Sequence, residues 1–553
     1  MAGAILGTHF CRFRYPDSRC PEPKGNMTLL IRNLALPLDH DEAELASATA
    51  AELGIGVADL RVHSIVRKSL DARRRREPRF LYTLALDLDS ELEAELLGRE
   101  PAPVEPFVPP RRIDVRTSSA DGPPPVVVGC GPAGLFAAWR LVVAGLAPIV
   151  IERGPDVTER TKRWNRFLRG DAFDPESNLL FGEGGAGAYS DGKLYTRIRD
   201  PRVHEVLEVL TASGAPRSIL YDAKPHIGSN LLPSVVRRMR RRLAERGADF
   251  RFSTRMTGLV IEDGHLRGVD LEPGGVLEAS SVFLGLGHSA RESIRNLHRD
   301  GVAMERKPFQ LGARIEHPQE TINRMQYGEH CDHPMLPPAD YRLVAKLPGG
   351  DLFSFCMCPG GEILPATEKP GFICVNGASP VGRRGRFANS GFVITLEPDR
   401  FQGKGVLAGI ELQEEIEARA ASLAEHPFGA PALRLGDFVG KRVTTGALPD
   451  SSYPMPLTVA PFEEFLPPPV IDALRAGLTG LCGRHPILRH PDAIIVGPES
   501  RSSCPVRIVR DPESLQSVST AGLYPMGEGA GYAGGIVSAA IDGLRCAEAH
   551  LTL

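Results

Sequence analysis

The stretch VVVGCGPAGLFAAWRLVVAGLAPIVIERG, residues 126–154, decides the fold of this chain. Its three leading valines predict a buried strand, and Gly129, Gly131 and Gly134 follow in the pattern G-x-G-x-x-G at a strand-to-helix turn. The first glycine permits the tight turn, the second lets the backbone approach a pyrophosphate, and the third lets the helix pack closely on the strand. A second apolar run ends at Glu152, an acid that can accept a hydrogen bond from the 2′-hydroxyl of an unphosphorylated adenosine ribose. Together these features predict a Rossmann-type dinucleotide-binding domain.

Two further glycine-rich segments favour FAD over a nicotinamide dinucleotide. Residues 182–193 read GEGGAGAYSDGK, and residues 527–535 read GEGAGYAGG before a helical pattern rich in small residues. FAD is long, and loops nearly free of side chains let its far end contact backbone, while a helix N-terminus stabilises charge on a reduced flavin ring. We therefore predict noncovalent FAD, with its flavin end held by these two segments.

Composition sets the class of protein. The chain has 553 residues, 42% hydrophobic and 24% charged, which suits a globular protein of several domains. Its formal net charge of −3 argues against a dedicated nucleic-acid binder, and its longest apolar stretch, residues 141–151, is too short to span a bilayer. Ten cysteines without a signal-peptide core predict a cytoplasmic protein, and no His/Cys cluster has the spacing of a metal site.

Strand and helix patterns, together with a Pro-rich stretch, predict an α/β chain of several domains. We expect a discontinuous Rossmann-type FAD-binding domain, an inserted α+β substrate domain and a small N-terminal ferredoxin-like α+β domain. The predicted segments are a disordered extension (1–26), the small α+β domain (27–110), a Pro-rich linker (111–125), the first part of the FAD-binding domain (126–288), the substrate or cap domain (289–514) and the C-terminal part of the FAD-binding domain (515–553). Because the cap is the only long region without cofactor signatures, we expect the reactive groups there.

Motifs spread over the chain carry a family resemblance. They include GCGPAGLFAA (129–138), PESNLLFGEGGAGAYSDGKL (175–194), KPFQLGARIEH (307–317), FSFCMCPGG (353–361), GPESRSSCPVRI (497–508) and GEGAGYAGGI (527–536). The chain resembles a bacterial family of FAD-dependent dehydrogenase-like proteins, largely uncharacterised NAD/FAD-utilising dehydrogenases, within the glutathione-reductase-like flavoprotein superfamily. The resemblance implies an FAD domain interrupted by a substrate-side domain, and it implies no particular reaction.

Carried over residue by residue, the resemblance implies a set of cofactor contacts. Glu152 and Arg153 would lie at the adenosine ribose, and Met256 falls where such flavoproteins usually have a valine whose backbone reads adenine. Glu528 stands where an aspartate commonly binds ribitol, and residues 285–287 resemble the return of the chain to the cofactor. The candidate FAD-binding residues are Gly129, Gly131, Pro132, Ala133, Gly134, Glu152, Arg153, Gly184, Gly185, Ala186, Gly187, Lys193, Met256, Gly287, Glu528, Gly529, Gly531, Gly534, Gly535 and Ile536.

The candidate catalytic residues are Cys358, His226 and Lys193. On a strand, Cys356 and Cys358 would share a face and could point into one pocket, although two small buried residues in a core strand are the alternative. His226, like His288, could act as an acid or base near a flavin or could be a hydrogen-bonded structural histidine. Lys193 closes a glycine loop, where a cation could stabilise a reduced flavin.

The predicted function is an FAD-dependent oxidoreductase, a dehydrogenase or reductase, acting on a small organic substrate, conjugated or aromatic molecules included. A flavin-dependent monooxygenase of a small molecule is the alternative reaction. The chain contains no second G-x-G-x-x-G on a strand, so NADH or NADPH is expected only as a transient co-substrate. No membrane partner is predicted, and the sequence leaves the oligomeric state open.

A basic turn in the N-terminal domain keeps one other class of protein open. It contains Arg67, Lys68, Arg73, Arg74, Arg75, Arg76 and Arg79. Such a run is found in RNA-associated proteins and equally at a solvated hairpin tip. We expect nucleic acid not to be the partner, and an RNA-associated flavoprotein is the alternative that this turn supports.

Overall fold

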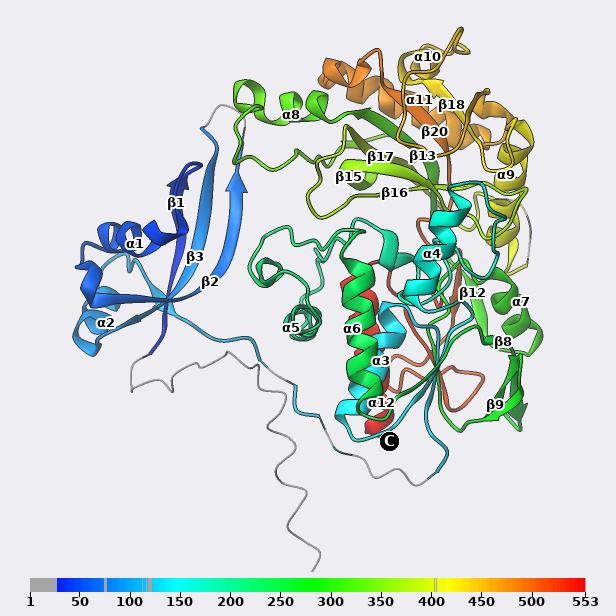
Figure 1. Cartoon of the computed structure of the whole chain (residues 1–553), viewed down its shortest axis with the longest axis horizontal. Helices are drawn as coiled ribbons and strands as arrows, with labels where there is room; N and C mark the ends of the chain where they lie inside the picture. Colours follow the sequence, from blue (N-terminus) through cyan, green and yellow to red (C-terminus); the bar gives the residue numbers. More distant parts are fainter. Residues whose placement is uncertain are drawn as a thin grey trace, which may run out of the picture.

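The computed structural model describes residues 27–73, 77–111, 113–115, 117, 122–401, 403 and 405–552. The predicted disordered extension, residues 1–26, and Arg74, Arg75 and Arg76 of the basic turn lie outside this range. Figure 1 shows a small unit of sheet and helices formed by the N-terminal part, beside a larger body. In that body a parallel sheet with long helices lies below a second, larger sheet. The mixed α/β class predicted from the sequence is confirmed.

The N-terminal unit is a sheet with two helices. Its elements are β1 (Leu29–Pro37), α1 (Leu45–Leu53), β2 (Leu60–Asp71), β3 (Arg79–Leu88), α2 (Ser90–Leu97) and β4 (Glu105–Pro106). The strands lie in the order β2-β3-β1-β4 with antiparallel neighbours, which is the ferredoxin-like β-α-β-β-α-β arrangement. Alternate residues of β1 and β3, among them Leu29, Ile31, Leu84 and Leu86, are buried in its own core. The carboxylate of Asp89 starts α2 by accepting from two backbone N–H groups of the first turn.

A parallel sheet forms the centre of the larger body. Its strands are β5 (Val126–Val128), β6 (Ile149–Ile151), β7 (Asp249–Arg251), β11 (Val282–Leu284) and β22 (Leu523–Pro525). They lie in the order β22-β11-β5-β6-β7, so the C-terminal part of the chain completes a sheet that the middle of the chain begins. All three valines of β5 are buried, as expected for a strand covered on both faces.

Helices cover one face of this sheet. They are α3 (Pro132–Val143), α5 (Arg202–Ala212), α6 (Leu232–Ala244) and α12 (Ile536–Leu551). A Cβ atom at Gly543 of α12 would lie 2.1 Å from the carbonyl oxygen of Ala133, so the absence of a side chain lets α12 approach α3 closely. Gly187 lies within contact of both Pro132 and Ile536, so the first turns of α3 and α12 meet at one place.

The opposite face carries a three-stranded antiparallel sheet. It consists of β8 (Arg255–Glu262), β9 (His265–Glu272) and β10 (Gly275–Glu278), and α7 (Arg291–Arg299) packs beside it, while α4 (Val157–Phe167) follows β6 in the chain. Leu259 and Val269 from this sheet share a core with Val126 and Val128. The apolar run of β5 therefore supplies side chains to both faces.

The upper part of the body, which we name the cap, is built on a mainly antiparallel sheet. Its strands are β13 (Phe309–Pro318), β14 (Val344–Ala345), β15 (Leu352–Pro365), β16 (Val375–Ala378), β17 (Phe387–Leu396), β18 (Ala430–Arg434), β19 (Leu457–Val459) and β20 (Ile494–Glu499). Its helices are α8 (Gln319–Tyr327), α9 (Ala408–Leu423), α10 (Leu435–Val439) and α11 (Pro468–Arg484), and β12 (Met304–Arg306) pairs with β21 (Val506–Ile508) where the chain enters and leaves it. The strands follow the order β14-β15-β17-β13-β20-β18-β19, with β16 paired to β15. A core of buried aliphatic and aromatic side chains lies against this sheet.

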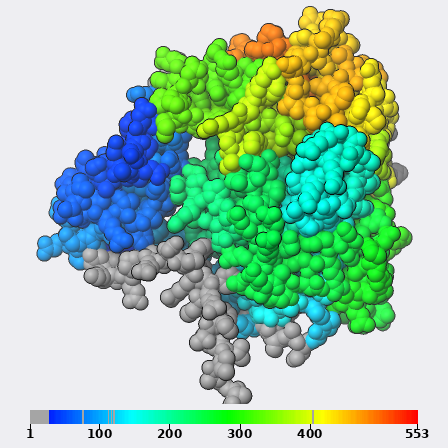
Figure 2. Space-filling model, in the orientation of Figure 1, coloured from blue at the N-terminus to red at the C-terminus, as the bar shows by residue number. Residues whose placement is uncertain are grey.

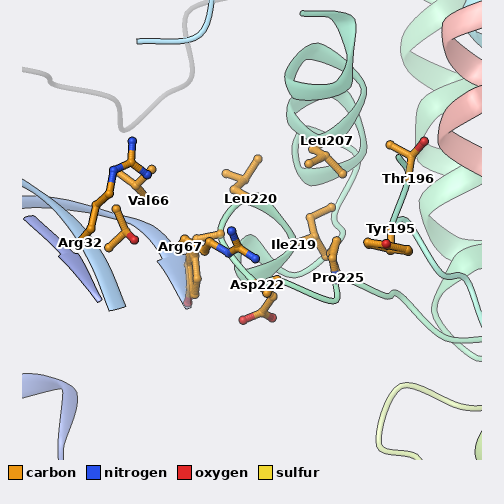
Figure 3. Close-up of a pocket in the computed structure, with 13 residues that line it drawn as sticks. Arg32, Val66, Arg67, Tyr195, Thr196, Leu207, Ile219, Leu220, Asp222 and Pro225 are labelled. Atoms are coloured by element: carbon orange, nitrogen blue, oxygen red, sulfur yellow. The ribbon is translucent and has the colours of Figure 1, made fainter. Parts of the chain in front are cut away.

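The N-terminal unit meets the body along β2. The N–H of Lys68 donates to the carbonyl of Tyr221, and the N–H of Ala223 donates to the carbonyl of Lys68. Figure 2 shows the blue N-terminal surface against the green surface of the body. A cavity of about 360 Å³ lies at this junction. Figure 3 shows side chains that line it, with Arg67 from β2 on one side and Tyr195 on the other. No helix in the described part of the chain is both long and apolar enough to cross a membrane.

Candidate functional site

A cavity of about 530 Å³ lies between the carboxyl ends of the parallel strands and the cap. Ligands of open α/β sheets bind at this edge. The predicted residues that line it are Gly129, Gly131, Pro132, Ala133, Glu152, Arg153, Gly185, Ala186, Gly187, Lys193, Met256, Gly287, Glu528, Gly534, Gly535 and Ile536. Segments more than 400 positions apart in the sequence therefore form one wall, which we name the glycine wall.

Four predicted glycines do not line the cavity. They are Gly134, Gly184, Gly529 and Gly531. A Cβ at Gly134 would lie 1.9 Å from the carbonyl oxygen of Gly129, and one at Gly529 would lie 2.6 Å from the carbonyl oxygen of Gly287. These glycines support the wall from behind, because only hydrogen fits where two backbone segments touch.

Gly131 differs from them because nothing in the chain fills the space beside it. A Cβ there would meet only the Cα of Gly185, at 4.0 Å, and Gly287 on the same wall has no atom within 4 Å of its own added Cβ. Packing within the chain thus gives no reason for a missing side chain at Gly131. The close approach of a ligand to the backbone explains why this position carries no side chain.

The first turn of α3 points its backbone N–H groups toward this space. Gly131 is the N-cap residue and supplies no capping side chain, so the N–H groups of the first turn have no side-chain acceptor. Such a helix start binds the oxygen atoms of phosphate groups. At the start of α12, by contrast, the Ser538 hydroxyl exchanges hydrogen bonds with the backbone of Gly535.

Glu152 directly follows β6 and is 7% exposed. Its carboxylate accepts from the backbone N–H groups of Cys130 (2.9 Å), Gly154 (3.0 Å) and Gly182 (3.0 Å). These bonds join the first glycine turn to the second glycine loop and fix the carboxylate on the cavity wall. Arg153 beside it pairs with a glutamate and stacks on an aromatic ring, so its guanidinium is held as well.

The opposite wall, which we name the cap wall, carries charged side chains that are already paired. Arg314 of β13 is fully buried and lies 2.6 Å from Glu499 of β20, which lines the cavity. Burial raises the pKa of Glu499, and the guanidinium of Arg314 opposes that shift. Arg501 also lines the cavity, but its guanidinium pairs with buried Glu417. Both guanidinium groups therefore form ion pairs within the chain.

The two thiols on β15 do not share one environment. Three steps along β15, from Phe355 to Cys358, match two steps along β17, from Gly391 to Asn389, so β15 contains a bulge. Cys356 lies in the bulge with φ +45°, a conformation that costs a non-glycine residue about 1–3 kcal/mol. As a result Cys356 lines the cavity and Cys358 lies fully buried behind it. A regular strand, which the i, i+2 argument assumes, would have pointed both thiols into the same space.

Lys193 lies between the two walls. Its Nζ is 2.9 Å from the carboxylate of Asp191 and 3.9 Å from the Sγ of Cys358. Burial lowers the pKa of Lys193, but Cys358, Cys356 and Asp191 outweigh burial and hold the pKa above its ordinary value. Lys193 is therefore a fixed cation at the edge of the cavity.

The two candidate histidines lie in different places. His226 does not line the cavity; its Nε2 bonds to the carbonyl of Val381 at 3.0 Å, and burial lowers its pKa. His288 does line the cavity, and its buried Nε2 has no hydrogen-bond partner within the described chain. Burial lowers the pKa of His288 to about 3. A neutral imidazole nitrogen on the cavity wall is thus left for a ligand.

Two residues at the cavity wall carried no motif and were missed from the sequence. Tyr195 is 50% exposed, and Arg342 lies over its ring at 5.7 Å. Hydrogen bonds from Arg197 and Arg342 lower the pKa of the Tyr195 hydroxyl.

Among the described residues, no group of three or more His, Cys, Asp or Glu side chains is arranged to hold a metal ion.

Comparison with known proteins gives the cofactor of the family to which the chain belongs. A family described as "FAD-dependent protein, C-terminal domain-like" matches residues 308–502, and a domain of unknown function matches residues 28–87. An uncharacterised protein of Clostridium beijerinckii is 39% identical over 530 residues, 94% of this chain and 98% of that protein. The chain belongs to a family of FAD-dependent proteins.

Solved structures of flavoenzymes are also similar to this FAD-dependent protein. An L-proline dehydrogenase from P. horikoshii is 12% identical, with 77% of this chain and 92% of that chain covered and a TM-score of 0.32. The flavin-dependent brominase Bmp2, as a triple mutant, is 13% identical, with 77% and 79% covered and a TM-score of 0.35. A geranylgeranyl bacteriochlorophyll reductase-like protein from Thermoplasma acidophilum is 12% identical, with 78% of each chain covered and a TM-score of 0.32. These values assign no reaction to this chain.

The residues of the cavity fit FAD. The open space at Gly131 and the uncapped start of α3 suit a pyrophosphate, and the unpartnered Nε2 of His288 needs a polar group that the chain does not supply. When bound, FAD supplies two-electron chemistry by accepting or donating a hydride. The FAD-dependent protein contributes the binding surface, the charges around it and the exclusion of water.

Proposed function

We propose that this FAD-dependent enzyme is a dehydrogenase or reductase of a small organic substrate, which binds between the flavin and the cap wall. One observation carries this proposal. The cavity extends beyond the residues that we expect to contact FAD. Its further lining includes Tyr195, Arg342, Ser354, Phe355 and Cys356. Two of these are aromatic rings, which suit a flat, conjugated substrate.

The roles of individual side chains follow from their positions. Lys193 places a positive charge at the edge of the cavity, where it stabilises negative charge that develops during electron transfer. His288 is neutral above about pH 3, and its unpartnered Nε2 is positioned to form a hydrogen bond with the substrate or the flavin. On the cap wall, Arg314 is paired with Glu499 and Arg501 with Glu417, so these charges are neutralised within the protein and need no charged group on the substrate.

The domain division is part of the same proposal. Residues 126–288 and 515–553 would form the FAD-binding unit, since β22 completes the sheet that contains β5, and residues 289–514 would form the substrate-side unit. The glycine motifs and the added three-stranded sheet support placement in the glutathione-reductase-like superfamily. NADH or NADPH would reach the flavin only as a transient co-substrate.

Stopped-flow measurement of flavin bleaching tests the reaction. We expect fast bleaching by an organic substrate, and slow bleaching by NADH or NADPH unless that substrate is present. Replacing His288 with Gln should slow bleaching by the substrate while leaving the flavin bound. Fast, saturable reduction by one nicotinamide nucleotide alone would contradict the proposal, because it would require a dedicated nicotinamide site.

A further inference from the structure

The proposed reaction leaves unused a pair of thiols at the cavity. The Sγ atoms of Cys356 and Cys358 are 3.9 Å apart. Cys356 lines the cavity that holds FAD, and Cys358 lies directly behind it without exposure to solvent. Cys356 is therefore accessible from the cavity, and it contacts Cys358.

The backbone of β15 brings the two sulfur atoms to about van der Waals contact. A disulfide has an S–S length of about 2.05 Å, so the two sulfur atoms need to approach by about 2 Å. The bulge at Cys356, with its φ of +45°, turns Cys356 toward the cavity, while its Sγ stays 3.9 Å from the Sγ of Cys358. Side-chain rotation supplies this movement more readily than a rearrangement of the sheet.

Charges around the pair favour the reactive thiolate at Cys356. Lys193 places its Nζ 3.9 Å from the Sγ of Cys358, and Arg314 donates to the carbonyl of Cys356 at 3.2 Å. The hydrogen bond from Cys358 and the nearby cations lower the pKa of the Cys356 thiol, whereas the same pairing and burial raise the pKa of the Cys358 thiol. The thiolate is the reactive form of cysteine in redox chemistry.

We infer that Cys356 and Cys358 form a dithiol–disulfide couple that exchanges two electrons with the bound FAD. In the oxidative direction the two S–H bonds break and the Sγ–Sγ bond forms. Two electrons and two protons pass to oxidised FAD, which becomes reduced FAD, and the reverse step returns them to the disulfide. This couple rests on FAD binding and is independent of which organic substrate the enzyme uses.

Anaerobic reductive titration of the oxidised holoprotein with dithionite counts the electrons. A flavin alone takes about two electrons, and a flavin with a disulfide takes about four. We expect about four per flavin in the wild type and about two in both Cys356→Ser and Cys358→Ser. Cys482→Ala, which removes a buried thiol of α11 in the cap core, should keep about four. Since dithionite needs no substrate, this result stands whether or not the proposed substrate class is correct.

Differential alkylation of the wild-type holoprotein assigns the disulfide without any variant. The protein is unfolded in denaturant so that burial protects no thiol. Thiols are then blocked before and after reduction, and mass spectrometry reads the label on each cysteine. We expect Cys356 and Cys358 to be protected together in the oxidised protein and labelled only after reduction. Labelling of both before reduction, together with about two electrons per flavin in the wild type, would overturn the inference.

Discussion

The two walls of the cavity recognise their ligands by different means. The glycine wall presents backbone and helix N–H groups, and its key positions carry no side chain, whereas the cap wall presents Cys356 and buried ion pairs. Backbone recognition depends on a few glycines at fixed spacing. Side-chain recognition depends on which residues a sheet happens to bring together. The first wall therefore specifies the cofactor, and the second is where relatives of this enzyme can differ in substrate.

Gly131→Leu gives the largest expected effect, because its side chain would occupy the pyrophosphate space. We expect a folded protein with no bound flavin, measured by absorbance of the purified protein and by its thermal unfolding. Gly134→Leu should instead lose the fold, because its Cβ meets backbone at 1.9 Å. Gly349→Leu, at an exposed loop with no atom within 4 Å, is the matched control and should retain flavin. Full flavin content in folded Gly131→Leu would remove the basis of the glycine wall.

Arg314→Met tests the ion pairs of the cap wall. The substitution leaves Glu499 buried without its partner, so we expect a loss of about 3–5 kcal/mol in the free energy of unfolding. Urea unfolding of the holoprotein measures it. Arg324→Met breaks an exposed pair with Glu320 and should change stability little. Equal effects in the two variants would mean that the buried pair does not support the cap.

His317 is a buried residue of β13 in the cap, away from the glycine wall. We expect it to make the folded protein less stable as the pH falls. Burial lowers the pKa of His317 from 6.5 to about 4 in the folded protein. The unfolded chain therefore binds the proton first as pH falls, and folding stability declines between about pH 6.5 and pH 4. The expected slope is about 1.4 kcal/mol for each pH unit. Thermal unfolding at several pH values should show a shallower decline in His317→Gln, and an unchanged decline would assign the acid sensitivity to other groups.

Glu528→Gln is expected to have the smallest effect. The Oε1 of Glu528 accepts from the backbone N–H of Cys504 at 2.8 Å, and the amide oxygen of glutamine can still accept that bond. FAD affinity should fall by about 1 kcal/mol, roughly fivefold in Kd, by fluorescence titration of the apoprotein. Glu528→Ala should weaken FAD binding further. Equal affinities in all three proteins would show that the carboxylate does not contribute to the cofactor site.

The sequence predicted the glycine wall far better than the cap wall. Gly129, Gly131 and Glu152 act within one strand-turn-helix-strand unit, so their positions follow from local spacing. His288 was considered from the sequence, but only the fold shows that it lines the cavity while His226 does not. The bulge that turns Cys356 toward the cavity and leaves Cys358 buried depends on how β15 pairs with a distant strand, and no local pattern predicts that register.

Tyr195 lies on the wall of both the flavin cavity and the smaller cavity at the junction with the N-terminal unit. The same side chain therefore borders two cavities that belong to different parts of the molecule. A substitution at this single position changes the lining of the space beside the N-terminal unit and of the space beside the cap at the same time.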